Sequence, residues 1–282
     1  MPREEMNAFI ANALQEDIGD GDHSTLACIA PSAKGKAVLK VKESGILAGM
    51  TVARQIFQYL EPDIHFQPLK EDGAPMQAGE SAFEVAGRVH TLLQAERLVL
   101  NCMQRMSGIA TLTRRYVDQI SAYPTKLLDT RKTTPGFRLL EKQAVAIGGG
   151  HNHRMGLYDM IMLKDNHIDF AGGIAAAIAK VQAYQKSQHL HLPVEVEARS
   201  MEEVREIVKA GQVQRIMLDN FSPEAAEAAV DYIAGRYETE ASGGITLETI
   251  EAYARARVDF ISAGAVIHHA TSLDLSLKAE NT

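Results

Sequence analysis

Hydrophobic and polar residues follow two different patterns, which meet near residue 124. Before it, polar and apolar residues alternate over 36–42, as in a half-buried strand, and 65–66 and 81–85 have the character of further short strands. Over 90–120, apolar residues recur every three or four positions, which predicts one long helix with a buried face. The first part of the chain therefore predicts a mixed α/β domain followed by a bridging helix.

After residue 124, short apolar runs alternate with amphipathic stretches. The last four runs recur about every 21 to 23 residues, the length of one strand–helix unit in a parallel barrel. Ser200, Ser222 and Thr246 occupy N-cap positions before the last three predicted helices. This pattern predicts a parallel barrel, either open or closed with eight strands, and leaves a doubly wound sheet as the alternative. The predicted strands are Lys126–Leu128, Met160–Leu163, Pro193–Glu197, Arg215–Leu218, Tyr237–Ala241 and Val258–Ser262.

Composition narrows the class of protein. With 282 residues, 46% of them hydrophobic and 23% charged, the chain can bury the core of one large domain or two smaller ones. No apolar run is long enough to span a bilayer, and the acidic start lacks the apolar core of a secretory signal, so we expect a cytoplasmic protein without a membrane partner. The net charge of −7 argues against nucleic acid. Cys28 and Cys102 are too few for a disulfide framework, and we expect both to be packing residues.

Positive charge is concentrated between Lys126 and His167. This segment carries seven Lys or Arg against four Asp or Glu, in a chain whose net charge is −7. Its two predicted strands run directly into charged residues at 129–132 and 164–167, and Gly-Gly-Gly-His-Asn-His-Arg lies between them at 148–154. A local cationic surplus in an acidic protein indicates a small anionic ligand rather than a polyanion.

The carboxyl ends of the later strands carry carboxylates and glycines. Loops and helix N-termini converge at this edge in parallel barrels, which is where their active sites lie. Glu197 and Asp219 end neighbouring strands and can hold a divalent cation, accept hydrogen bonds from sugar hydroxyls, or act as acid and base. Glu195 shares the face of Glu197, and the sequence does not decide between them. Phosphate-binding turns are predicted at Ser242, Gly243, Gly244, Gly264 and Ala265.

The basic side chains suit carboxylate or phosphate groups. Arginine offers bidentate geometry to such groups, and lysine and histidine add charge-assisted donors. The histidines at 151, 153 and 167 could form a metal cluster, but the chain has no HExxH spacing, and zinc is disfavoured. Neither a GxSxG elbow nor a Walker-type loop is present. The candidate donors are Arg131, Lys132, His153, Arg154 and Lys164.

A series of ordered motifs extends over nearly the whole chain. They are EDIGDGD at 16–22, Glu96-Arg97, DTRKTTPG, GGGHNHRMGLYD, KDNHI, EVE, LDNF, ASGGIT and DFISAGA. In this order and spacing the chain resembles the quinolinate phosphoribosyltransferases, the carboxylating nicotinate-nucleotide pyrophosphorylases of NAD biosynthesis. So many motifs in one order make the resemblance specific.

The resemblance implies an α/β fold with three parts: an N-terminal α/β sandwich with the bridging helix over 1–112, an open parallel α/β barrel over 113–272, and a C-terminal segment, 273–282, that returns to the first domain. It implies transfer of phosphoribose from phosphoribosyl pyrophosphate to quinolinate, with Mg²⁺ as cofactor. It also implies a homodimer or larger homo-oligomer in which Arg97 reaches the neighbouring active site.

The resemblance also assigns roles to individual residues. The glycine-bearing turns match the 5′-phosphate cradle, Glu197 and Asp219 match the ribose and magnesium carboxylates, and the basic cluster matches the binding site of quinolinate and pyrophosphate. Lys132, Lys164, Glu197 and Asp219 are expected to be catalytic. The substrate-binding set implied is Arg97, Thr130, Arg131, Lys132, His153, Arg154, Lys164, Glu197, Asp219, Ser242, Gly243, Gly244, Gly264 and Ala265.

Two departures and two alternatives accompany the resemblance. Histidines stand at positions 23 and 151, where typical members carry other residues. A related branch linked to molybdenum transport genes shares the fold and acts on another aromatic base, but the full TRKTTPG and NHRMGLYD motifs favour the quinolinate enzyme. A non-catalytic phosphometabolite sensor would keep the glycine turns without needing Glu197, Asp219 or the basic cluster.

Overall fold

The computed structural model describes residues 3–280, which fall into two compact units. The first unit reaches to Arg114, takes in Thr133–Gly149 and resumes at His269. The second unit consists of Arg115–Lys132 and Gly150–His268. Within residues 3–280, every helix is too short or too polar to cross a membrane.

An antiparallel sheet forms the centre of the first unit. The strand order is β12 (Leu275–Glu280), β1 (Lys34–Val41), β5 (Ser81–Arg88) and β3 (His65–Pro68). The three strands predicted in this half of the chain are thereby confirmed. β12 runs antiparallel to β1, so the end of the described chain belongs to this sheet.

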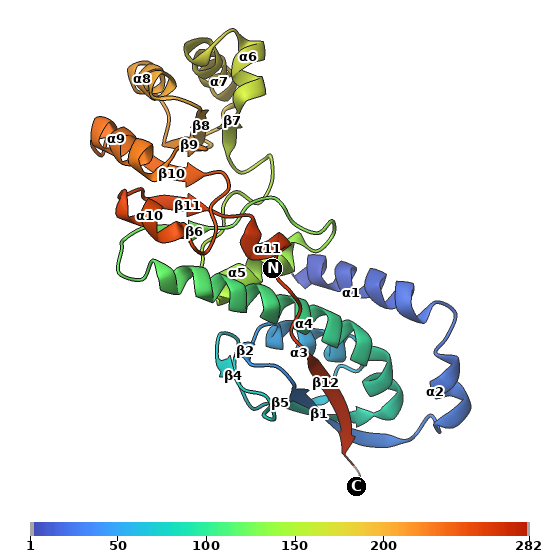
Figure 1. The fold of residues 1–282 in the computed structure, drawn as a ribbon. Coiled ribbons are helices and arrows are strands. Elements are labelled where there is room, and N and C mark those ends of the chain that lie inside the picture. Colours follow the sequence, from blue (N-terminus) through green and yellow to red (C-terminus); the bar gives the residue numbers. More distant parts are fainter. Residues whose placement is uncertain (1–2, 281–282) are drawn as a thin grey trace. The chain divides into compact units, whose positions relative to one another are not determined.

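Two helices, α3 (Met50–Leu60) and the long helix α4 (Val89–Gln119), pack against the sheet of the first unit (Figure 1). Aromatic rings join helix to sheet, since Phe83 lies 6.0 Å from Phe57 and 4.6 Å from Phe66, measured between ring centroids. Gly108 lets the C-terminal segment approach the long helix, because a Cβ at this position would overlap the carbonyl oxygen of Thr271. The other helices are α1 (Arg3–Ile18), α2 (His23–Cys28) and α5 (Arg138–Ile147), and β2 (Gly45–Ile46) pairs with β4 (Pro75–Met76).

The long predicted helix is confirmed as α4, which runs on into the second unit. Cys102 on this helix is buried, and burial raises the pKa of its thiol to about 12. Cys28 ends the short helix α2 and is exposed, so the expectation that it is a packing residue is wrong. An apolar neighbourhood in the sequence does not bury the last residue of a short surface helix.

A six-stranded parallel sheet forms the second unit. All six strands predicted after residue 124 are confirmed, with small shifts at their ends. Within the described residues, the two edge strands pair with no further strand, so the sheet is an open barrel rather than a closed one. In spatial order the strands are β6 (Lys126–Leu128), β11 (Phe260–Ser262), β10 (Glu238–Ser242), β9 (Arg215–Asp219), β8 (Val194–Ala198) and β7 (Ile161–Leu163).

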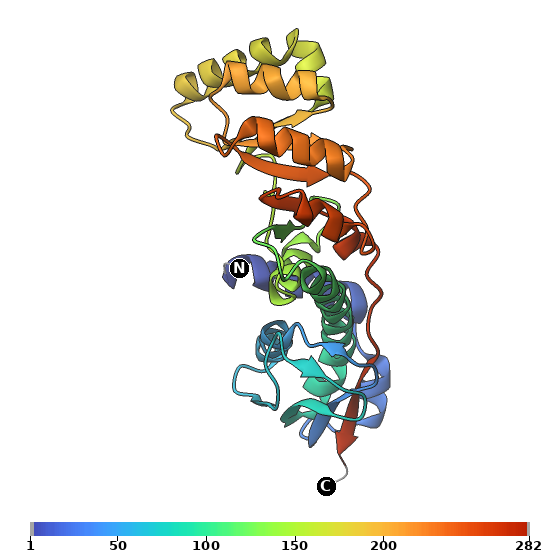
Figure 2. The same ribbon diagram turned by 60° about the vertical axis from the view of Figure 1, so that its left-hand side comes forward.

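Helices follow the strands of the second unit and lie side by side along the sheet (Figures 1 and 2). The predicted caps Ser200 and Ser222 are confirmed, since their hydroxyls accept the backbone N–H groups of Glu203 and Ala225. Thr246 is not an N-cap, because the polar residues after it form a turn first and the helix begins at Ile250. The helices are α6 (Asp165–Ala171), α7 (Ile174–Gln188), α8 (Met201–Ala210), α9 (Pro223–Ile233), α10 (Ile250–Arg255) and α11 (Ala265–His268).

Candidate active site

Polar side chains occupy one face of the adjacent strands β8, β9 and β10. Residues two apart in a strand share a face, which groups Glu195 with Glu197 and Glu240 with Ser242. The register pairs Ser242 with Asp219, so Glu197, Asp219 and Ser242 lie at the carboxyl ends of neighbouring strands. Glu195 and Glu240 lie one layer deeper, and both are completely buried. The strand ends therefore form a polar rim above a charged interior.

Lys164 and Glu197 form an ion pair on this rim. Lys164 directly follows β7, and its Nζ donates to Oε2 of Glu197 at 2.8 Å. The lysine side chain is 46% exposed, whereas the glutamate side chain is only 8% exposed. The ammonium group is therefore accessible to a ligand, while the carboxylate beneath it is shielded from water.

Two arginines add positive charge near the rim. Nη1 of Arg154 donates to the carbonyl oxygen of Met160 at 3.2 Å. Burial and then the neighbouring positive charge of Arg131 lower the pKa of Arg154. An anion bound between like charges relieves their repulsion, so this arrangement suits a carboxylate or phosphate ligand.

Lys132 lies close to Gly264, in the last of the glycine turns. A Cβ on Gly264 would lie 3.0 Å from Cδ of Lys132 and 3.1 Å from Nε2 of His268, so both side chains lie close against this glycine. The hydroxyl of Thr130 accepts the backbone N–H of Lys132 at 3.1 Å, which tightens the turn after β6. The sequence indicated Lys132 but missed His268, the last residue of α11, the short helix that begins at Ala265 directly after Gly264.

The other glycine turn joins the ends of β9 and β10. Gly243 has φ +101°, and a Cβ there would overlap the carboxamide oxygen of Asn220. Asn220 donates its backbone N–H to the carbonyl oxygen of Ser242 at 2.8 Å and its side-chain N–H to Oδ2 of Asp219 at 2.8 Å. Asn220 thus ties a predicted carboxylate to a predicted phosphate turn, a role that the sequence alone did not indicate.

His153 lies in the interior rather than on the rim. Its side chain is 5% exposed, and Nε2 lies 3.0 Å from Oε2 of Glu195 and 3.4 Å from Oε2 of Glu240. The three ligand-type atoms lie within 4.8 Å of one another, a spacing that would suit a cation, but Arg215 already contributes a positive charge at 2.9 Å from Glu240. Glu195 therefore contacts His153 in the interior of the barrel, whereas Glu197 lies at the carboxyl end of β8.

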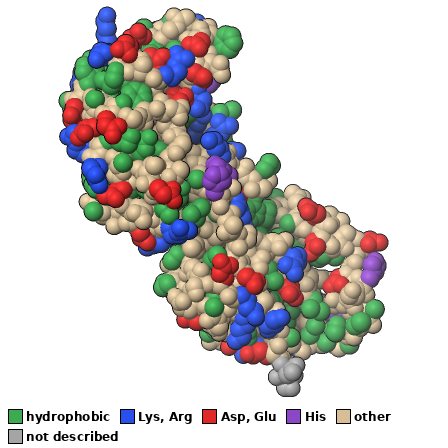
Figure 3. Space-filling model, viewed as in Figure 1, with side chains coloured by type: hydrophobic (Ala, Val, Ile, Leu, Met, Phe, Trp, Pro, Cys, Tyr) green, Lys and Arg blue, Asp and Glu red, His purple; other side chains and the backbone are tan. Residues whose placement is uncertain are grey.

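Arg97 stands apart from the other predicted site residues. It is exposed on α4 in the first unit, whereas all the others belong to the second unit. In Figure 3, Lys and Arg side chains gather along the side of the second unit where the strands of Figure 1 end. This distribution agrees with the local cationic surplus read from the sequence.

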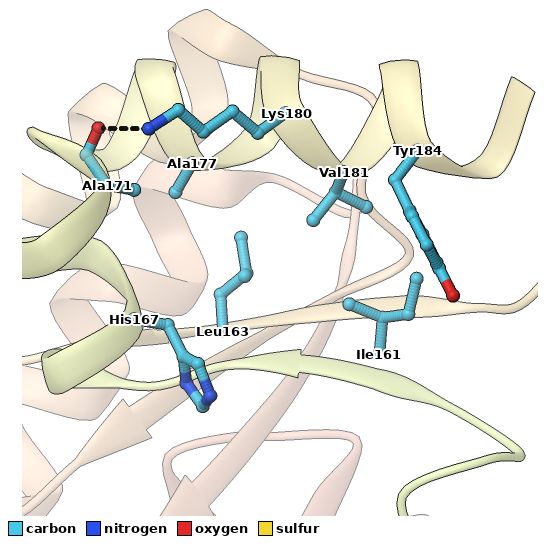
Figure 4. Close-up of a pocket in the computed structure, with 8 residues that line it drawn as sticks. All are labelled: Ile161, Leu163, His167, Ala171, Ala177, Lys180, Val181 and Tyr184. Carbon is cyan, nitrogen blue, oxygen red and sulfur yellow. Dashed lines mark hydrogen bonds between the residues drawn. The ribbon is translucent and has the colours of Figure 1, made fainter. Parts of the chain in front are cut away.

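A separate cavity of about 300 Å³ lies beneath α7 beside the edge strand β7 (Figure 4). Its lining is mainly aliphatic, and its lysine, Lys180, donates to the carbonyl oxygen of Ala171 at 3.0 Å. His167 lines this cavity, and its Nδ1 accepts the backbone N–H of Lys164. A largely apolar lining does not suit an anion, so the rim is the better candidate for the active site.

Comparisons with known proteins identify the family of this chain. Residues 22–107 match the family model of the quinolinate phosphoribosyl transferase N-terminal domain, and residues 109–278 match that of the C-terminal domain. The chain belongs to the quinolinate phosphoribosyl transferase family. Membership confirms the resemblance found from the motifs and the fold expected from it.

Relatives in the quinolinate phosphoribosyl transferase family match almost the full length of this chain. The chloroplastic carboxylating nicotinate-nucleotide pyrophosphorylase of Arabidopsis thaliana is 44% identical, over 99% of this chain and 84% of the relative. A probable enzyme of the same name from Synechocystis is 44% identical, over 97% of this chain and 92% of the relative.

Solved structures of the family are equally similar. The nicotinate-nucleotide pyrophosphorylase of Francisella tularensis has a TM-score of 0.91 at 40% identity, covering 99% of this chain and 98% of that one. NadC from Streptococcus pyogenes has a TM-score of 0.92 at 40% identity, covering 100% and 99%. The likeness therefore includes both units of the fold.

Proposed function

We propose that this protein transfers phosphoribose from phosphoribosyl pyrophosphate to quinolinate and releases carbon dioxide, giving nicotinate mononucleotide and pyrophosphate for NAD biosynthesis. The Lys164–Glu197 pair carries this proposal, because it places an accessible cation and a shielded carboxylate side by side at one strand end. The reaction needs a cation to bind the anionic substrates and a carboxylate to stabilise the positive charge that develops on the ribose. Family membership supports the same reaction.

The carboxylates are assigned to the sugar. As pyrophosphate leaves with the electron pair of its bond to the ribose, positive charge develops on the ribose ring, and Glu197 and Asp219 stabilise it. Glu197 is preferred over Glu195, because Glu195 is fully buried against His153. Two carboxylates on adjacent strands also have the oxygen ligands that Mg²⁺ uses together with substrate phosphates. When bound there, Mg²⁺ would neutralise the charge of the pyrophosphate leaving group.

The cations are assigned to quinolinate and pyrophosphate. Quinolinate carries two carboxylates, so at least two fixed cations are needed to orient its ring nitrogen toward the sugar carbon. Arg131, Arg154 and Lys164 fill this role, and Lys132 faces the pyrophosphate. Once the ring nitrogen bonds the sugar it is cationic, so the electrons of the bond to the adjacent carboxylate pass into the ring as carbon dioxide leaves, and the ring carbon takes a proton from solvent.

The glycine turns are assigned to the 5′-phosphate. Gly243 and Gly244 have φ values of +101° and +60°, so the turn takes a conformation that few other residues adopt. Such turns point backbone N–H groups at an anion. Ser242, Gly264 and Ala265 complete this side of the site.

The direct test follows nicotinate mononucleotide in a mixture of purified protein, quinolinate, phosphoribosyl pyrophosphate and Mg²⁺. The proposal predicts product that depends on both substrates and falls when the metal is chelated. No product in the complete mixture would remove the proposal. Product only with a different aromatic base would instead place the protein with the molybdenum-linked branch.

We also propose that the active protein is a homodimer or larger assembly with shared sites. Arg97 is exposed on α4 and belongs to the first unit, whereas the other candidate residues belong to the second. If Arg97 serves a neighbouring subunit, Arg97→Ala and Lys164→Ala proteins, each with strongly reduced activity, regain activity when mixed, because some mixed dimers contain one intact site. Native mass spectrometry of size-labelled variants checks that subunits exchange. Exchange without recovered activity contradicts shared sites.

A further inference from the structure

The carboxylate of Glu141, on α5 in the first unit, is completely buried and accepts hydrogen bonds from two residues. Nε and Nη2 of Arg105 donate to its Oε1 at 3.0 and 2.8 Å. The hydroxyl of Thr134 donates to Oε1 at 3.0 Å, and the backbone N–H of Thr134 donates to Oε2 at 2.8 Å. A buried carboxylate persists when it is paired and hydrogen-bonded, so these groups hold one another in place.

Arg105, on α4, holds a second segment at the same time. Its Nη1 donates to the carbonyl oxygen of Ala270 at 2.6 Å, while Nε and Nη2 face Glu141. The guanidinium is planar and presents its donors in a fixed fork, which the flexible ammonium of a lysine does not reproduce. One rigid side chain therefore fixes Ala270 and the Glu141 carboxylate relative to each other, and Thr134 with them.

The segment held at Thr134 includes Lys132. The chain passes from the second unit to the first between Lys132 and Thr133, so Lys132 precedes Thr134 by two residues. Two residues span at most about 7 Å, which means that a fixed Thr134 limits where the main chain of Lys132 can lie. The backbone N–H of Lys132 also donates to the hydroxyl of Thr130 at 3.1 Å. The main chain of this exposed lysine is thus restrained from both sides.

The turn between Thr134 and α5 is itself well ordered. The carbonyl oxygen of Thr134 accepts the backbone N–H of Phe137 at 3.0 Å, and Gly136 takes a positive φ of +76° within the turn. The ring of Phe137 packs against that of Phe9, with 5.7 Å between the centroids. Thr134 is therefore held by the turn that follows it as well as by Glu141.

We infer that Glu141 and Arg105 are positioning residues for Lys132: they hold Thr134, and through it the main chain that presents Lys132 to the pyrophosphate group. This inference rests on the proposed function and deepens it, because it names what fixes a lysine that serves the leaving group. Both residues act through the segment 132–134 and contact no substrate.

Glu141→Gln tests the inference. The new side chain has the same size, but its NH₂ group cannot accept from Arg105 or Thr134, so the segment is held less firmly. At temperatures well below unfolding, kcat/KM for phosphoribosyl pyrophosphate is expected to fall about tenfold, with the KM for quinolinate within about twofold. Equal losses for the two substrates would overturn the inference.

Glu80→Gln is the matched control. Glu80 belongs to the first unit and also accepts a backbone N–H, that of Gln77 at 2.7 Å, and a cation, Lys70 at 2.9 Å. It does so in the turn before β5, and the segment around Lys132 has no part in these contacts. Glu80→Gln should leave both kinetic constants unchanged. Equal effects of Glu80→Gln and Glu141→Gln would overturn the inference.

A double-mutant cycle separates positioning from a merely structural role. If Glu141 acts through Lys132, the Lys132→Ala/Glu141→Gln protein should have the same kcat/KM for phosphoribosyl pyrophosphate as Lys132→Ala alone, because the group being positioned is already gone. A general weakening of the fold would instead multiply the two losses, and multiplied losses would overturn the inference.

Thr134→Val keeps the inference testable if circular dichroism shows that Glu141→Gln does not fold. It removes only the hydroxyl's hydrogen bond and leaves the Arg105–Glu141 ion pair intact. We expect kcat/KM for phosphoribosyl pyrophosphate to fall about two- to fivefold, as for the loss of one hydrogen bond, and to be insensitive to the change when Lys132 is already alanine. An unchanged kcat/KM for Thr134→Val would contradict the positioning role.

Amide hydrogen exchange over residues 130–134 gives a readout that does not depend on activity. Glu141→Gln should speed exchange at Lys132 and Thr134 at least about tenfold, because the N–H groups that hold this segment open more often, and Glu80→Gln should not. Unchanged exchange in Glu141→Gln would overturn the inference. If the unmodified protein turns over no quinolinate, the proposed function fails, while the exchange rates still decide whether Glu141 holds this segment.

Discussion

Lys164→Ala is expected to lower kcat/KM for quinolinate by about 10²- to 10³-fold, the range found when one preorganised group that stabilises charge is removed. Its ammonium group is the accessible half of the Lys164–Glu197 pair, at 2.8 Å from the carboxylate. The change removes a cation from the anion-binding side and leaves the shielded carboxylate of Glu197 without its lysine. Steady-state kinetics with each substrate varied in turn measure both effects.

Lys180→Ala is the matched control for this prediction. Lys180 belongs to the same unit and also makes a single hydrogen bond, to the carbonyl oxygen of Ala171, but it lies at the apolar cavity rather than at the rim (Figure 4). It should keep kcat/KM within about twofold, as expected of a surface substitution away from the site. If Lys164→Ala behaved in the same way, Lys164 would have no part in the reaction.

Gly243→Ala is expected to weaken both the second unit and its binding of phosphoribosyl pyrophosphate. The new methyl group would overlap the carboxamide of Asn220, and φ +101° is strained for any residue with a Cβ. Overpacking costs about 1–3 kcal/mol and backbone strain about 1–3 kcal/mol more in the free energy of unfolding. Because Asn220 also holds Asp219, the KM for phosphoribosyl pyrophosphate should rise by at least about tenfold.

Gly244→Ala separates the collision from the general effect of losing a glycine. Gly244 also has a positive φ, +60°, but nothing lies within 4 Å of a Cβ there. It should cost only about 1–2 kcal/mol, the ordinary penalty of a left-handed residue. Urea unfolding and kinetics of both variants provide the comparison. Equal losses at the two positions would show that the contact with Asn220 is unimportant.

Most of the fold could be predicted because its periodic signals are strong. The six parallel strands follow from apolar runs at regular spacing, and the Ser200 and Ser222 caps follow from a hydroxyl before a helical pattern. Thr246 fits the same rule but fails, because a turn stabilised by Thr249 lies between it and the helix. A local cap signal cannot exclude a competing turn.

The polar rim at the strand ends could be predicted, but the buried contact between Glu240 and His153 could not. Charged residues at strand ends are visible as soon as the strands are placed, which is how Lys164, Glu197 and Asp219 were found. Residues 238–240 read Glu-Thr-Glu, so Glu238 and Glu240 share one face of the strand. Two glutamates on one face are typical of a face that is exposed to water. Only the register across the parallel sheet shows that this face points into the barrel, where Glu240 meets His153.

The central claim is that the basic side of the rim selects a dicarboxylate for phosphoribosyl transfer. The most direct measurement incubates the protein with phosphoribosyl pyrophosphate, Mg²⁺ and equal concentrations of quinolinate and nicotinate, with ¹⁴C in the carboxylate of quinolinate that is lost. The account predicts nicotinate mononucleotide, pyrophosphate and labelled carbon dioxide in equal amounts, with nicotinate unconsumed. Equal consumption of the two acids, or product formed without labelled carbon dioxide, would contradict it.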